Sequence, residues 1–538
     1  MGPVVDDLAP LGQALADLLA GFRDSAGLTQ EVLADRLGYA RVTISCAERG
    51  HRLPARGFWV DADALLAADG ALIRVYDQLV AARQDNSRRR ARQADAERRA
   101  RASGRPRSGG QISPTMIDQV GRRGSAAGDR TGPAAGGSSW PAALASTAAP
   151  IALRGRVDDG RQGETWALSV SRGRFFSGST LDAVVCGAID EGGRILAAVP
   201  AGLVEDPLLR RASRGLLVCV VPGRPGATSY GLDTRTARRL LAQAGPGARL
   251  VVPRAYALDD LTLGLSWAVA NLDESLLGDD AVLVGHRERL AGYESFPRSA
   301  AGRDDADGLS AVSQMWLGSD FCARHILRHA EQLADAPTFW TREQRGEEAS
   351  TWLLFAHKYD YLRRVADRFG GAGLARAFCI PADAVTDSPR FERVLLLLAA
   401  ALMESVGVRV DVCADPEYAA VEGFVLAPSR RAIVANWVGA DGIWHVDVTD
   451  RRPLLREYAD ITGHTRAHSV TAAATAAGRL RGFAAYLDLD WDWLTRRCAE
   501  LGDYGLAGVA EPRSRLLSAA GVDQACRYLG GLDRPARP

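Results

Sequence analysis

The chain has 538 residues, 47% of them hydrophobic and 24% charged, which excludes a protein disordered throughout and predicts about three globular domains. The formal net charge is +1, so overall charge cannot hold nucleic acid, and any such binding needs a local basic surface. Arginine supplies every basic side chain except that of Lys358.

Neither a membrane span nor a disulfide framework is predicted. The longest apolar run, residues 394–403, is much shorter than the roughly 18–20 residues that a membrane-spanning helix needs. The first residues lack the basic and apolar segments of a signal peptide, so we expect a cytoplasmic protein without membrane contact. The eight cysteines form no CxxC pair, which argues against a zinc ribbon and favours reduced thiols, several of them buried.

Composition divides the chain into five segments. Residues 1–82 carry apolar side chains at helical spacing and are expected to form an all-α domain. Residues 83–150 are rich in arginine and then in Gly, Ala, Ser and Pro, which predicts a disordered linker. Strand-like runs alternate with amphipathic helices in 151–300 and again in 371–530, which predicts two α/β (α+β) domains, the second with a helical tail. A helical segment at 301–370 separates them.

The first 50 residues predict three short helices. An apolar stripe over residues 11–22 indicates the first helix, which Gly27 ends. Thr29 is the expected N-cap of the second helix, and Gly38 ends that helix before a short turn. Residues 41–49 form the third helix. Two short helices joined by a glycine-led turn are a helix-turn-helix, in which the second helix of the unit enters the major groove of DNA.

This stretch resembles the Xre/Cro helix-turn-helix family, in the version found in regulators of high-GC bacteria. The matching text is AGLTQEVLADRLGYARVTI at 26–44, AERG at 47–50, Phe58-Trp59 and GAL at 70–72. The resemblance implies that Arg41, Val42 and Cys46 face the bases, and that Gln30, Thr43, Arg49, His51 and Arg52 touch phosphates. Cys46 departs from the family pattern, because a thiol is a poor hydrogen-bond donor for base readout.

An arginine-rich run at 88–101 follows this unit and has two interpretations. As a basic arm it would add salt-sensitive affinity for any DNA sequence. As a linker it would only be well solvated. The sequence leaves both open.

The rest of the chain carries no nucleotide-binding loop, nucleophile elbow or HExxH motif, so no cofactor is predicted. Strands are expected at 194–200, 215–221, 249–253 and 374–380, and near 407–413, 421–426, 431–437 and 443–448. Helices are expected at 233–244, 309–334, 342–369 and 389–405.

Two clusters in the C-terminal region could carry chemistry. Cys322, His325 and His329 share one face of a predicted helix and are candidate metal ligands, with Glu343, Glu347 or His357 as a fourth; the alternative is an ordinary helix face. The polar and aromatic side chains at 340–348 and 357–361, including Lys358, could line a pocket or form an exposed helix with charge pairs.

Residues 374–447 resemble one half of a phospholipase D-type domain, in the order strand, helix and several strands. The catalytic His-x-Lys of that family is missing, since 423–431 contains neither residue. The resemblance implies a hydrolytically dead scaffold reused as a sensor. Longer stretches of the region, such as Phe175–Gly178 and Phe321–His325, are similar to the C-terminal part of regulators that carry the same helix-turn-helix.

The leading hypothesis is a sequence-specific transcription regulator. It would bind double-stranded DNA as a homodimer, and its C-terminal region would sense a small-molecule effector, oligomerise, or both. One alternative is an enzyme fused to an autoregulatory DNA-binding domain, using residues among His325, His329, Glu347, His357 and Lys358. The other is a protein-interaction scaffold.

Overall fold

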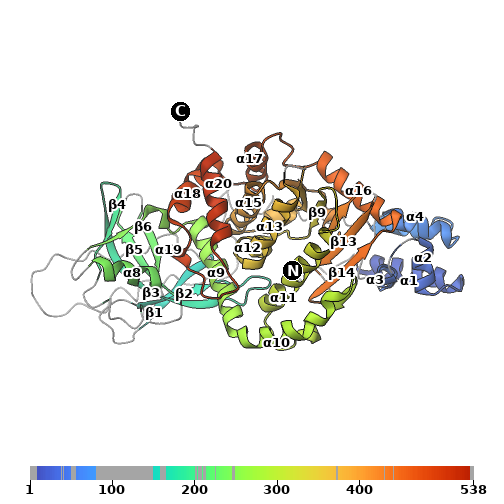
Figure 1. Ribbon diagram of the computed structural model, residues 1–538, viewed down its shortest axis with the longest axis horizontal. Helices are drawn as coiled ribbons and strands as arrows, with labels where there is room; N and C mark the ends of the chain where they lie inside the picture. Colours follow the sequence, from blue (N-terminus) through green and yellow to red (C-terminus); the bar gives the residue numbers. More distant parts are fainter. Residues whose placement is uncertain are drawn as a thin grey trace, which may run out of the picture. The chain divides into compact units, whose positions relative to one another are not determined.

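The computed structural model describes residues 9–79, 144, 149–157, 165–199, 203, 209 and 214–532, with gaps at 38, 40, 50–55, 224–225, 245–248, 371–372, 429 and 440–441. These residues belong to two compact units, 1–138 and 139–538, and Figure 1 labels many of their helices and strands. The linker predicted at 83–150 lies almost wholly outside the described residues. The domain boundaries predicted at 300 and 370 fall inside the second unit and stay predictions.

The first unit is helical, as predicted. Its helices are α1 (Ala9–Ser25), α2 (Gln30–Leu37), α3 (Arg41–Glu48) and α4 (Arg56–Leu65), and residues 71–79 are also helical. Leu33 and Leu37 of α2, and Ile44 and Ala47 of α3, are buried in one core, which confirms the inner faces predicted for these helices. The indole of Trp59 from α4 lies in the same core, so apolar burial holds the helices together.

Within the described residues, the second unit contains two mixed sheets of seven strands each. The first sheet is formed by β1 (Ile151–Val157), β2 (Thr165–Val170), β3 (Ser179–Glu191), β4 (Arg194–Ala197), β5 (Gly215–Val221), β6 (Thr228–Asp233) and β7 (Leu250–Val252). Its neighbouring strands are antiparallel, except that β3 and β5 run parallel.

The second sheet has the strand order β11-β10-β9-β12-β13-β14-β8. Its strands are β8 (Ser299–Ala301), β9 (Thr338–Thr341), β10 (Ala375–Cys379), β11 (Arg409–Cys413), β12 (Phe424–Ala427), β13 (Arg431–Asn436) and β14 (Trp444–Thr449). Strands β9, β10 and β11 run parallel, and the remaining pairs are antiparallel. The five strands predicted between 374 and 448 are confirmed as β10 to β14. Sequence analysis did not predict β8 and β9.

Helices fill the space between the two sheets (Figure 1). The helices drawn there include α9 (Asp260–Gly278), α12 (Gly346–Leu354), α15 (Arg390–Ser405), α18 (Trp491–Tyr504) and α20 (Ala520–Leu532). The apolar run at 394–403 lies in α15 and is buried throughout, because a helix that is apolar all round needs cover on every side. None of the helices in the described part of the chain is long and apolar enough to cross a membrane.

The second unit contains further helices, some of which pack on the sheets and others on neighbouring helices. They are α8 (Thr234–Ala244), α10 (Asp280–Leu290), α11 (Ala311–Ala330), α13 (Ala356–Phe369), α14 (Ala382–Asp387), α16 (Arg452–Ala467), α17 (Ala476–Tyr486) and α19 (Ala507–Ala510). Side chains of β9 alternate between two cores: Phe339 belongs to the main core, whereas Trp340 packs in a smaller one with Leu455 and Tyr458 of α16.

The prediction of one long helix at 342–369 is wrong, because the structure has two helices in this range, α12 and α13. Phe355 interrupts them with an extended backbone and forms a bridge with Leu517. The Ala356 amide donates to the carbonyl of Leu516 at 3.1 Å, and the Ser518 amide donates to the carbonyl of Leu354 at 2.8 Å. The helical pattern continues through the break, so only the tertiary pairing with residues 516–518 ends α12.

Candidate functional site

A carboxylate joins the three helices of the helix-turn-helix. Glu48, at the end of α3, accepts hydrogen bonds from Arg23 of α1 and from Gln30 Nε2 of α2, the latter at 2.7 Å. Arg23 also donates to the carbonyl of Leu28 at 2.9 Å, in the turn before α2. Hydrogen bonds between charged groups are stronger than neutral ones, so this cluster fixes the angle of α3 against α1 and α2.

The turn before α2 follows its predicted chemistry. Gly27 has a φ of +66°, a conformation that glycine adopts without steric cost, and it ends α1. Thr29 Oγ1 accepts a hydrogen bond from the Val32 amide at 3.2 Å, which confirms Thr29 as the N-cap. The N-cap therefore fixes the residue at which α2 begins, and with it the position of the backbone amides in the first turn. A helix start that binds a phosphate needs its amides in such a fixed position.

The residues predicted to contact DNA are described to different extents. Arg41, Val42, Thr43 and Cys46 have their backbone in α3, and their side chains lie outside the described structure. His51 and Arg52 lie wholly outside it. Gln30 is half-buried and its amide group donates to Glu48, so this side chain helps to position α3. Arg49 is exposed, and its Nε donates to the carbonyl of Ser45 at 3.1 Å.

The second unit holds a cavity of about 50 Å³ between α11, α12 and the second sheet. Roughly three water molecules would fill that volume. Aromatic side chains form part of its wall, and they are Phe339, Trp352, Tyr361 and Trp437. The polar groups in the wall include Lys358, Arg376 and Glu343, all three of them buried. The predicted pocket near 340–361 therefore has a counterpart in the structure.

Lys358 is enclosed by aromatic rings. Its Nζ lies 4.0 Å from the ring centres of both Trp352 and Trp437, and it donates to Glu343 Oε1 at 3.1 Å and to Thr351 Oγ1 at 2.9 Å. Burial lowers the pKa of Lys358 to about 8, against the opposing attraction of Glu343. These two hydrogen bonds use two of the three donors of an ammonium group.

Arg376 is a second buried cation in the same wall. Its guanidinium carbon lies 4.5 Å from the ring centre of Phe339 and 4.6 Å from that of Trp352. Nη1 donates to Thr341 Oγ1 at 2.8 Å, but Nε has no hydrogen-bond partner among the described residues.

These groups give the cavity a positive balance. The buried wall contains two cations, Lys358 and Arg376, and one carboxylate, Glu343. Buried donors without partners cost free energy unless another group accepts from them. A small anion would supply acceptors and charge to both cations, and the aromatic rings would exclude water around it.

The structure does not bring the residues predicted for catalysis together at one centre. Glu347 accepts hydrogen bonds from the amides of Arg174, Phe175 and Phe176 at 2.8, 2.7 and 2.6 Å, so its carboxylate holds the loop between β2 and β3. His357 Nε2 lies 2.8 Å from Ser319 Oγ, and burial keeps the pKa of His357 well below its ordinary value. Its Nδ1 has no partner in the described structure to orient the ring.

The three candidate ligands on α11 do not converge either. Cys322 is buried in the wall of the cavity. The rings of His325 and His329 lie 4.6 Å apart, and burial lowers the pKa of His325 to about 3. Among the described residues, the one group of three metal-ligating side chains whose donor atoms lie within 4.8 Å of each other is elsewhere, at Cys413, Asp415 and His464.

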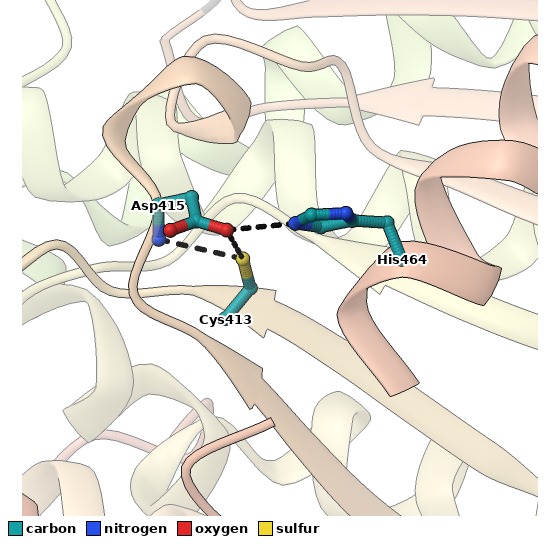
Figure 2. Close-up of side chains that lie close together, drawn as sticks. All are labelled: Cys413, Asp415 and His464. Atoms are coloured by element: carbon teal, nitrogen blue, oxygen red, sulfur yellow. Dashed lines mark hydrogen bonds and ion pairs between the residues drawn. The ribbon is translucent and has the colours of Figure 1, made fainter. Parts of the chain in front are cut away.

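That group was not found by sequence reasoning, because His464 lies 49 residues beyond Asp415 and only the fold brings it to Cys413 and Asp415. Figure 2 shows one carboxylate oxygen of Asp415 in contact with both of the other side chains: His464 Nε2 lies 2.7 Å from Asp415 Oδ2, and Cys413 Sγ lies 3.6 Å from the same oxygen. A hydrogen bond with the Cys379 thiol lowers the pKa of Cys413 to about 7, and the bond to His464 lowers the pKa of Asp415. The signal in the sequence was two cysteines near the ends of predicted strands, Cys379 one residue before the end of 374–380 and Cys413 at the end of 407–413.

Comparison with known proteins identifies one part of the chain. Residues 14–75 match the model of a family described as a helix-turn-helix domain. No curated protein and no solved structure matches the chain. The first unit therefore contains a helix-turn-helix domain, which is typical of DNA-binding regulators.

Proposed function

We propose that the protein is a sequence-specific transcription regulator of the Xre/Cro type. The observation that carries the proposal is the helix-turn-helix match at 14–75 together with the Glu48 cluster, which fixes α3 against α1 and α2. A recognition helix needs such a fixed angle, because its side chains must reach base edges in the major groove. One helix reads few base pairs, so we propose that the protein binds two half-sites as a homodimer.

Within α3, the proposal gives base contacts to Arg41, Val42 and Cys46. Arg41 can donate twice to a guanine, and Val42 offers an apolar contact. Thr43 and Arg49 are proposed to touch phosphates, as are His51 and Arg52. The basic run at 88–101 stays a prediction, as arm or as linker.

DNA capture tests this function directly. Fragmented genomic DNA is incubated with the purified full chain, and the bound fragments are sequenced. The expected result is a recurrent motif with two half-sites about one DNA turn apart. A control protein in which Arg41 and Arg49 are both replaced by alanine should not enrich it. Capture of the same fragments by both proteins would contradict the proposed role of α3.

The replacement Arg41→Ala is expected to weaken binding to the captured site by about 1–3 kcal/mol and to relax the preference at one base pair. The reason is the loss of two hydrogen bonds to one base, with phosphate contacts retained. Fluorescence anisotropy on the site and on single-base variants measures both effects. Arg154→Ala removes the same charge from an exposed position in the second unit and serves as the control. Unchanged affinity would remove Arg41 from the readout.

The second part of the proposal concerns the effector. We propose that the cavity between α11, α12 and the second sheet binds a small anion, or the anionic group of a larger effector. The support is the pair of buried cations, Lys358 and Arg376, in a wall whose buried carboxylate, Glu343, pairs with Lys358, and the donor Arg376 Nε, which lacks a partner in the described structure. A region that binds such a ligand differently in two conformations could change DNA occupancy by linkage. Repeating the DNA capture with a metabolite extract tests this coupling.

The effector site should be sensitive to pH. Lys358 is charged below its pKa of about 8 and neutral above it, and an anion binds better to the charged form. Affinity for a carboxylate probe such as acetate, whose own charge is constant in this range, should therefore fall roughly tenfold from pH 8.5 to 9.5. Tryptophan fluorescence reports binding, because Trp352 and Trp437 flank Lys358. A constant affinity between pH 7 and 9.5 would contradict the role of Lys358, without affecting the proposed DNA binding.

A further inference from the structure

Two parallel strands of the second sheet end in cysteine at the same edge. Cys379 is the last residue of β10 and Cys413 the last of β11, and the two are register partners. Side chains of register partners on parallel strands point to the same face, so the thiols are neighbours. The Cys379 thiol donates to the carbonyl of Asp415 at 3.2 Å. Carboxyl ends of parallel strands are where α/β sheets commonly place ligand sites.

An imidazole and a carboxylate complete the group. Asp415 follows β11 by two residues, and His464 projects from α16, which covers this face of the sheet (Figure 2). The donor atoms of Cys413, Asp415 and His464 lie within 4.8 Å of one another, whereas Cys379 Sγ lies beyond that distance from at least one of them and would have to turn toward a bound ion. The backbone amide of Asp415 donates to Cys413 Sγ at 3.4 Å, the kind of hydrogen bond that supports a metal-bound sulfur.

The spacing suits a tetrahedral ion. With zinc bonds of about 2.3 Å to sulfur and about 2.0 Å to nitrogen or oxygen, neighbouring donors lie roughly 3.3–3.8 Å apart. Cys413 Sγ and Asp415 Oδ2 are 3.6 Å apart, within that range. His464 Nε2 and Asp415 Oδ2 are 2.7 Å apart because they form a hydrogen bond, and a side-chain movement of less than 1 Å would open this pair to the required distance.

The order of the groups argues against a nucleophilic cysteine. In a Cys-His-Asp triad the imidazole contacts the thiol, and the carboxylate contacts the far nitrogen of the ring. Here Asp415 lies between Cys413 and His464 and contacts both. The side chains of His464 and Asp415 are 32% and 48% exposed, whereas both thiols are buried, so an ion can enter from solvent and reach the sulfurs.

We propose that Cys379, Cys413, Asp415 and His464 bind one Zn²⁺ ion. Two thiols, one imidazole and one carboxylate form a ligand set that zinc accepts, and four protein ligands are typical of a structural site. The ion would join α16 to the ends of β10 and β11. This site is separate from the cavity and from α3, so it holds or fails independently of the proposed function.

Cobalt titration of the full chain tests the proposal. The protein is prepared without a polyhistidine tag, reduced, stripped with a chelator and titrated anaerobically with Co²⁺. One equivalent should produce the thiolate-to-metal absorption and the strong visible bands of a tetrahedral site, and Zn²⁺ should abolish both. Zn²⁺ alone should also raise the melting temperature, since it binds only the folded chain.

Substitutions of the proposed ligands test which side chains bind the ion. Cys413→Ser and His464→Gln should each weaken Co²⁺ binding by about 100-fold or more, because second-shell changes alone cost 10- to 100-fold. Cys379→Ser should remove about half of the thiolate absorption, since one of two sulfurs is lost. Two matched controls should bind as the unaltered chain does: Cys186→Ser, from a thiol pair 3.5 Å apart on β3 and β5, and His329→Gln on α11.

Several results would overturn the proposal. One is the absence of tetrahedral cobalt bands in the reduced, folded chain. Another is their persistence in Cys413→Ser, with circular dichroism confirming that the variant is folded. Loss of the bands in His329→Gln but not in His464→Gln would move the metal to α11. Isolation of the chain with a Cys379–Cys413 disulfide, together with no metal uptake after reduction, would equally overturn it.

Discussion

Replacing Lys358 by methionine should lower the free energy of unfolding of the second unit by about 3–5 kcal/mol. Glu343 is buried, and Lys358 is its ion-pair partner at 3.1 Å. Without the ammonium, the buried Glu343 carboxylate keeps the hydrogen bond from Trp352 Nε1 to Oε1 at 3.0 Å, and Arg376 of the same wall forms no ion pair with it among the described contacts. A charge left without compensation in the interior costs far more than the pair contributes when it is intact.

The double variant with Lys358→Met and Glu343→Gln should recover most of this loss, because it removes both charges at once. Urea unfolding followed by tryptophan fluorescence gives the midpoints of the three proteins. Arg364→Met is the control, since its ion pair with Glu331 is exposed and should contribute less than about 1 kcal/mol. A single variant as stable as the unaltered chain, or a double variant no more stable than the single one, would contradict this account.

The second large effect is expected at Glu347. This carboxylate accepts from three consecutive amides, those of Arg174, Phe175 and Phe176, and it is buried. Glu347→Ala removes the acceptor of all three amides, of which that of Phe176 is buried and those of Arg174 and Phe175 are partly buried, and an unsatisfied buried donor costs about 1–3 kcal/mol. We expect a loss of about 3–5 kcal/mol in stability after partial relaxation and entry of water.

Glu347→Gln should show about half of that loss, because one oxygen still accepts while the new amide group faces backbone donors. Hydrogen exchange gives a local readout: the amides of 174–176 should lose protection in Glu347→Ala. Glu417→Ala removes an exposed carboxylate and should change neither stability nor exchange. Full protection of 174–176 in Glu347→Ala would show that other contacts hold the loop, and would return Glu347 to the set of candidate catalytic residues.

The contact between Glu347 and the loop also explains why residue 173 is a glycine. A side chain at Gly173 would collide with the carboxylate oxygens of Glu347, so the close approach of the loop to α12 requires the smallest residue there. The loop between β2 and β3 is therefore fitted to a side chain more than 170 residues further along the chain.

Buried charges also anchor the end of the chain to the first sheet. Arg513 donates to Asp233 Oδ1 at 2.7 Å, and Arg214 pairs with both Asp233 and Asp273. The amides of Arg513 and Ser514 donate to Asp273 at 2.9 Å. These contacts join residues from both ends of the second unit, which explains why 139–538 form one compact body.

Local patterns in the sequence predicted the elements whose stability is local. In the first unit, apolar spacing placed Leu33 and Ile44 inside, and Thr29 capped α2 as expected, because each signal lies within a few residues of the structure that it specifies. Strands β10 to β14 were predictable for the same reason, because each is a short apolar run between turn residues.

Tertiary contacts decided the features that no local pattern contains. The break at Phe355 depends on pairing with Leu517, and the enclosure of Lys358 depends on Trp437, which follows β13 much later in the chain. Cys379 and Cys413 are adjacent only because β10 and β11 pair in one register. The sequence by itself determined the helix-turn-helix and the alternation of strands and helices, because backbone propensity and apolar spacing are properties of neighbouring residues. The tertiary structure alone determined which charged, aromatic and thiol side chains meet, because a site is a property of packing between distant segments.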